Sequence, residues 1–163
     1  MFESIKQFER SAFDVKLSYL WVLHADKIPP HVGISVEGNY FSLKYNGKDE
    51  GVSVESVIEL IEKKPIKTLA IQLKKVIVSD ELKNAFARFE RTSPNEVTCL
   101  APIEKALGKT KFEKLELLLH DLELHNELEE IIGFNIDESY KGIPFYTEAD
   151  IHKRLQFLEN VNE

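Results

Sequence analysis

Two side chains in this sequence can carry out chemistry together if folding brings them into contact: the thiol of Cys99 and the imidazole of His31. A thiolate attacks a carbonyl carbon, and an imidazole accepts the thiol proton and returns it to the leaving group. Cys99 is the single cysteine among 163 residues, so no internal disulfide can form and no cluster of thiolates can hold a metal. The pair predicts a candidate nucleophile and base.

The residues around Cys99 favour the start of a helix. Thr98 is a suitable N-cap, Pro102 is tolerated in a first turn, and Gly108 is a typical helix end. The pattern therefore predicts a helix over residues 99–107. A cysteine in a first helical turn feels unpaired amide donors and the positive end of the helix dipole, which lower the thiol pKa.

The residues around His31 favour antiparallel strands. Bulky apolar residues predict a strand over 17–24, and paired prolines place a loop before His31. Gly and Asn residues mark two tight turns between short apolar segments, and Asn46-Gly47 is the stronger signal. The expected segments are strands over 31–36 and 40–45, joined by a turn at 37–39, with residues 51–54 pairing next.

Residues 31–41, His-Val-Gly-Ile-Ser-Val-Glu-Gly-Asn-Tyr-Phe, resemble the histidine hairpin of the NlpC/P60 papain-like cysteine peptidases. In most of that family the cysteine precedes the histidine. Here Cys99 follows His31, which is the order of the circularly permuted branch that includes the lecithin:retinol acyltransferase-like proteins. The resemblance covers about residues 17–108 as an order of elements, and it implies a permuted papain-like core.

The resemblance implies a thiol hydrolase or acyltransferase-like enzyme that acts on an amide or ester bond. Cys99 would be the nucleophile and His31 the general base, with no metal or organic cofactor. The family usually adds a third polar residue on the return strand, where this chain offers Ser42 and Lys44. His24 could line the same cleft. The alternative is a non-catalytic binding module with the same fold.

The remaining pattern predicts an α+β fold, a small antiparallel sheet packed against helices, in one domain over 1–163. Its core would span about 17–108, and a helical extension would span about 109–163. We expect a strand over 68–73 with a further strand region at 76–78. The expected helices cover 2–13, 55–63, 80–91, 112–132, and 147 or 148 to 158.

The net charge of −7 argues against a nucleic-acid partner, which needs a concentrated basic face. No apolar run is long enough to cross a bilayer and no signal-peptide pattern opens the chain, so we expect a cytoplasmic protein. The substrate class stays open among small molecules, peptides and lipids. The leucine-rich helix over 112–132 could pack on the body, form a homodimer or bind a protein partner, and the acidity leaves open a basic protein as that partner. His120 and His125 lie five residues apart, which is not the spacing of a metal pair on a helix.

Overall fold

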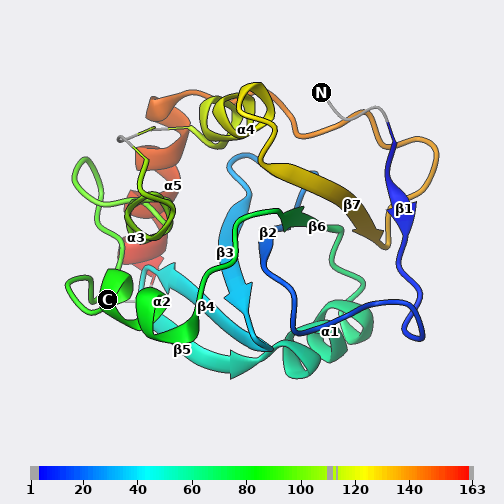
Figure 1. The fold of residues 1–163 in the computed structure, drawn as a ribbon. Helices are drawn as coiled ribbons and strands as arrows, with labels where there is room; N and C mark the ends of the chain where they lie inside the picture. The colour runs from blue at the N-terminus through cyan, green and yellow to red at the C-terminus, as the bar shows by residue number, and fades with distance from the viewer. Residues whose placement is uncertain (1–3, 110–111, 113, 162–163) are drawn as a thin grey trace.

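A mostly antiparallel sheet runs through the computed structural model, which describes residues 4–109, 112 and 114–161. Within those residues the sheet has seven strands in the order β1-β7-β6-β2-β3-β4-β5, and five helices flank it (Figure 1). The strands are β1 (Lys6–Gln7), β2 (Tyr19–Leu23), β3 (His31–Val36), β4 (Asn39–Lys44), β5 (Gly47–Ser53), β6 (Thr68–Leu73) and β7 (Leu128–Phe134). The helices are α1 (Val54–Lys63), α2 (Ser79–Phe86), α3 (Ala101–Leu107), α4 (Leu115–Leu124) and α5 (Glu148–Val161).

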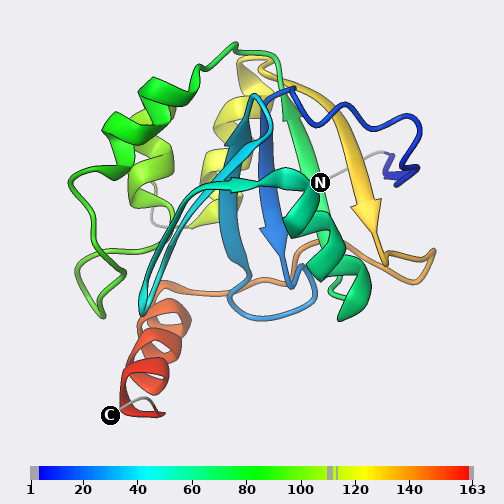
Figure 2. The same cartoon turned by 90° about the horizontal axis from the view of Figure 1, so that it is seen from below.

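The strands β2 to β5 form an antiparallel meander, as the sequence predicted. Glu37 and Gly38 turn the chain between β3 and β4 with φ values of +52° and +81°. The second turn, which starts β5 at Gly47, brings Asp49 opposite Ser42. This hairpin extends beyond the rest of the sheet toward α5 (Figure 2). Residues 51–53 of the expected segment at 51–54 are thus the end of a longer strand, and Val54 already starts α1.

The helix α1 connects β5 to β6, which lies beside β2 on the side opposite β3. It begins after Ser53, whose hydroxyl accepts a hydrogen bond from the backbone N–H of Ser56. The strand β6 then pairs antiparallel with β2 and has the predicted bounds. Residues 76–78 form no strand, and α2 ends at Phe86, earlier than the expected helix over 80–91.

The two faces of the sheet bury two separate apolar clusters. Alternate residues of β2 divide between them, since Leu20 and Val22 belong to one cluster and Trp21 and Leu23 to the other. The first cluster also takes residues from α2, α3, α4 and α5, and the second takes the apolar side of α1. His31 pairs directly with Leu23 and therefore starts on the α1 face.

The expected helix over 2–13 is wrong for the residues that the structure describes there; residues 2 and 3 lie outside them. Lys6 and Gln7 form β1, which pairs parallel with β7. The ring of Phe8 stacks on Phe134, with centroids 4.3 Å apart, and Phe13 stacks on Tyr19 at 4.7 Å. These aromatic contacts with the sheet replace the helical face that the spacing indicated.

The expected helix over 112–132 is also wrong, because the chain divides into α4 and β7. His125 ends α4, and Asn126 has a φ of +54°, a left-handed conformation that a continuing helix cannot contain. From Leu128 onward the chain pairs antiparallel with β6. Residues 112–132 therefore offer no single leucine-rich helix to a partner.

Most of the leucines in α4 already lie in the core. The buried ones are Leu115, Leu118, Leu119 and Leu122. The solvent-facing side keeps Leu117 and Leu124, which are 47% and 70% exposed. The strand β7 belongs to the same sheet as the hairpin of His31. Among the described residues, no helix has the length and apolar character needed to span a membrane.

Candidate functional site

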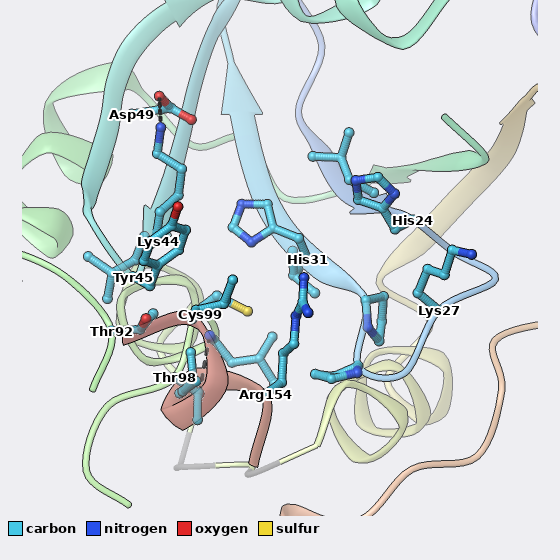
Figure 3. A pocket seen from close by; sticks show the side chains of 18 of the residues that line it. His24, Lys27, His31, Lys44, Tyr45, Asp49, Thr92, Thr98, Cys99 and Arg154 are labelled. Atoms are coloured by element: carbon cyan, nitrogen blue, oxygen red, sulfur yellow. Dashed lines mark hydrogen bonds and ion pairs between the residues drawn. The ribbon is translucent and has the colours of Figure 1, made fainter. Parts of the chain in front are cut away.

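A cavity of about 950 Å³ lies where β3 begins, lined by residues of α1, the β4–β5 hairpin and α5. Both His31 and Cys99 line it (Figure 3), and residues of α1 and α5 contribute to the same lining. Most of its lining is apolar and includes Val57 and Leu60 of α1 and Leu155 and Leu158 of α5. The volume suits a ligand of the size of a substrate or cofactor.

His31 holds a nitrogen atom that is shielded from solvent and has no hydrogen-bond partner. The residue as a whole is partly exposed, but its Nε2 is buried in the cavity wall and unpaired. Burial lowers the pKa of His31 to about 4, although the nearby Asp49 carboxylate acts in the opposite direction. The imidazole is therefore neutral at pH 7, which is the form that accepts a proton.

Cys99 lies before α3 and not inside it, which corrects the expected helix over 99–107. The helix begins at Ala101, and Gly108 ends it in a left-handed conformation as predicted. Leu100, and not Thr98 as expected, is the N-cap of α3; the Thr98 hydroxyl accepts a hydrogen bond from the backbone N–H of Leu100, in the turn that contains Cys99. The thiol is thus outside the first helical turn, where the dipole and amide donors act most strongly.

The expected lowering of the thiol pKa is also wrong. Burial raises the pKa of Cys99 to about 11, and the carboxylate of Glu104 adds to the rise. The nearby backbone N–H groups of Val32 and of Cys99 itself act in the opposite direction and lower the pKa. Burial prevails, so the thiol is neutral at pH 7.

The two candidate residues approach the cavity from different faces of the sheet. Cys99 packs against the cluster on the α3 and α4 side, whereas His31 starts on the α1 side. They meet around the start of β3, where the backbone N–H of Val32 lies near the sulfur. The unpaired Nε2 shows that no hydrogen bond joins this nitrogen to the thiol in the free protein. The resting pair is a neutral thiol and a neutral imidazole in one cavity.

The two polar residues expected on the return strand meet a third residue that the sequence reasoning missed. Asp49 accepts a hydrogen bond from Ser42 at 2.9 Å and one from Lys44 at 3.0 Å. Its carboxylate lines the cavity and favours the charged form of His31. The Asn46-Gly47 turn could have predicted the role of Asp49, because that turn sets the hairpin register in which Asp49 lies opposite Ser42.

His24 lines the same cavity, and so do Lys27 and Arg154. Burial lowers the pKa of His24, and the two cations lower it further against the effect of Asp26. The sequence reasoning missed Arg154, because it considered only the apolar positions of the last helix. In α5, Ile151, Arg154, Leu155 and Leu158 all face the cavity at helical spacing.

The two histidines of the α4 region lie away from this cavity, and both are exposed. His125 stands beside Asp121 and Glu127, whose oxygens could hold a cation. The ammonium of Lys109 takes that position, 3.0 Å from Asp121 and 2.6 Å from Glu127. This cluster is therefore an internal ion-pair network.

Comparisons with protein-family models, with curated proteins and with solved structures gave no match. The fold is α+β, with a mostly antiparallel open sheet of seven strands and five helices among the described residues.

Proposed function

We propose that this chain is a thiol hydrolase or acyltransferase-like enzyme with a circularly permuted NlpC/P60-like, papain-like core, and that it acts on an amide or ester bond. One observation carries the proposal: Cys99 and His31 line one cavity, and the buried Nε2 of His31 is unpaired there. The resemblance of residues 31–41 to a histidine hairpin, and the order of His31 before Cys99, support the same class.

The pKa values of the two groups define how such a pair works. With the thiol near 11 and the imidazole near 4, a resting thiolate–imidazolium pair is a negligible population. In the proposed step, the sulfur of Cys99 bonds to the substrate carbonyl carbon while His31 takes the thiol proton. His31 then gives this proton to the leaving group as the carbonyl–heteroatom bond breaks. Water, or an acceptor alcohol or amine, cleaves the thioester.

Neighbouring groups support each half of this step. The backbone N–H groups of Val32 and Cys99 stabilise negative charge on the sulfur as the proton leaves. Asp49 stabilises the imidazolium that forms, and Ser42 and Lys44 hold its carboxylate. In this proposal Asp49 has the supporting place that the resemblance assigned to Ser42 or Lys44.

The second candidate is a binding module that keeps the fold and lacks the chemistry. The raised pKa of Cys99 and the lowered pKa of His31 favour it, because both groups rest in their neutral forms. In that case the largely apolar cavity would hold a ligand without cleaving it. The two candidates differ in whether Cys99 becomes covalently acylated.

The test uses p-nitrophenyl dodecanoate as the acyl donor. The wild-type protein should release a burst of p-nitrophenolate and gain the mass of one dodecanoyl group. The single cysteine fixes the thioester site, and neutral hydroxylamine should remove the group. Cys99→Ala should show neither signal, and His31→Gln should slow acylation by roughly a hundredfold or more. His120→Gln, on the exposed side of α4, should match the wild type.

Circular dichroism and thermal unfolding should show that each variant is folded. If the wild-type protein gains no more acyl groups than folded Cys99→Ala, the hydrolase proposal is wrong and the binding module replaces it.

A further inference from the structure

The cavity combines apolar side chains with cationic ones, and we call the part lined by Lys27 and Arg154 its mouth. Val57 and Leu60 of α1 face it from one side, and Leu155 and Leu158 of α5 face it from the other. Between these walls, the side chain of Arg154 extends from α5 into the cavity below His31 in the view of Figure 3. An apolar chain can thus lie along the helices while its head group meets the guanidinium.

The cations that line the cavity differ in whether a carboxylate partner lies beside them. Lys44 is paired with Asp49 at 3.0 Å, so its charge is neutralised. Lys27 forms a longer ion pair with Asp26 at 3.9 Å, and its side chain is 68% exposed. Arg154 lies over the ring of Phe157, 5.3 Å from the centroid, and no ion pair links it to a carboxylate within residues 4–109, 112 and 114–161. Arg154 is therefore the cation that a ligand can pair with.

This positive mouth belongs to a chain whose net charge is −7. A free fatty alcohol would gain only from the apolar walls, whereas an anionic amphiphile would also gain from Arg154. The guanidinium is well suited to the head group because it presents paired N–H donors that match carboxylate and phosphate oxygens. A cationic head group would meet repulsion at the same place.

We propose that the cavity binds a molecule with a long alkyl or acyl chain and an anionic head group, carboxylate or phosphate, and that Arg154 binds the head. The inference rests on the proposed function only in calling this molecule the substrate; as a binding site it stands with either candidate. The chain lies between α1 and α5, and the carbonyl to be attacked lies between the head group and Cys99. Arg154 is then a specificity-determining residue.

Isothermal titration calorimetry tests this with four probes of equal chain length: dodecanoate, dodecyl phosphate, dodecanol and dodecylammonium. At least one anion should bind roughly tenfold more tightly than dodecanol, and dodecylammonium should bind most weakly. The affinities for dodecanoate and dodecyl phosphate show whether the site prefers a carboxylate or a phosphate head group. Octanoate should bind more weakly than dodecanoate, by roughly tenfold for each two methylene groups removed, if the chain is buried.

The matched variants are Arg154→Gln and Lys153→Gln, which remove one charge each from neighbouring positions of α5. Lys153 is exposed and does not line the cavity. Arg154→Gln should weaken anion binding by roughly tenfold and leave dodecanol binding unchanged, whereas Lys153→Gln should leave both unchanged. Equal effects of the two variants, equal affinities for anion and alcohol, or no binding of any probe would overturn the inference.

Repeating the titrations with Cys99→Ala separates this inference from the proposed chemistry. Selective anion binding by a chain that p-nitrophenyl dodecanoate never acylates would remove the hydrolase proposal and support this site. Acylation at Cys99 without selectivity for anions would support the hydrolase proposal and overturn the inference of an anion-selective site.

Discussion

The sulfur of Cys99 lies next to the backbone N–H of Val32, the residue that follows His31 in β3, and this N–H lowers the pKa of the thiol. The turn before α3 thus lies beside the start of the strand that carries the imidazole. The thiol therefore meets a strand backbone, and α3 begins only at Ala101. It follows that burial, more than a helix dipole, determines how Cys99 reacts.

The free protein should react slowly with iodoacetamide at pH 7. Because the pKa of Cys99 is raised to about 11, the thiolate fraction should be roughly two orders of magnitude below that of free cysteine. The alkylation rate should rise about tenfold per pH unit up to about pH 10. Stopped-flow or mass-spectrometric rates between pH 6 and 10 measure this profile, with free cysteine as the reference.

His31→Gln should leave this alkylation profile nearly unchanged, because the imidazole is neutral above pH 5 and forms no resting ion pair. The same variant should slow acylation by p-nitrophenyl dodecanoate, where His31 takes a proton. A fast reaction at pH 6 that disappears in His31→Gln would instead reveal a thiolate–imidazolium pair and contradict the neutral resting state.

The burial of neutral His31 should make the protein sensitive to acid. The folded-state pKa of about 4 lies below the ordinary value of 6.5, so the unfolded chain binds this proton more readily. The contribution to stability is complete above pH 6.5 and is lost as the pH falls toward 4, by about 3 kcal/mol at most. Urea unfolding at pH 7, 5.5 and 4.5 measures it.

The free energies of wild type and His31→Gln should converge, or reverse in order, over that pH range, because the glutamine cannot be protonated. His120→Gln, whose exposed side chain lies outside the cavity, should follow the wild type at every pH. Parallel curves for wild type and His31→Gln would show that the imidazole titrates normally in the folded state.

The local patterns around β2 to β6 were sufficient to predict that part of the fold. Strand β3 and strand β6 have the expected bounds, because turn residues and apolar runs delimit them within a few positions. The same reasoning failed over residues 112–132, where leucines at helical spacing continue into a strand. Pairing with β6, a contact distant in sequence, determines β7, and local periodicity does not report it.

Local sequence patterns named two residues of this cavity and not its other residues, for a related reason. His31 and Cys99 were identified by their chemistry, and both line the cavity. The raised pKa of the thiol could not be foreseen, because it depends on how much protein surrounds Cys99. Arg154 was missed because a charged residue on a helix is usually solvated, and only the packing of α5 shows that it faces the cavity.

Gly33→Ala should destabilise the protein by about 3 kcal/mol, because no space exists for the added methyl group. A Cβ atom at Gly33 would lie 2.3 Å from the hydroxyl oxygen of Tyr40 and 2.5 Å from its ring. In a Tyr40→Leu background the same substitution should cost much less. A double-mutant cycle from urea unfolding measures the difference, and a cycle without coupling would show that Tyr40 does not pack over Gly33.

Ser35→Ala should destabilise the protein by about 1–3 kcal/mol, because it leaves a buried donor without its acceptor. The indole N–H of Trp21 donates a hydrogen bond of 2.8 Å to the Ser35 hydroxyl, and both residues are fully buried. The loss should be smaller in a Trp21→Phe background, where no indole N–H remains to be satisfied. Urea unfolding followed by circular dichroism measures all four proteins, because Trp21 fluorescence is absent from two of them. Equal costs in the two backgrounds would mean that the hydroxyl contributes through packing and not through the indole.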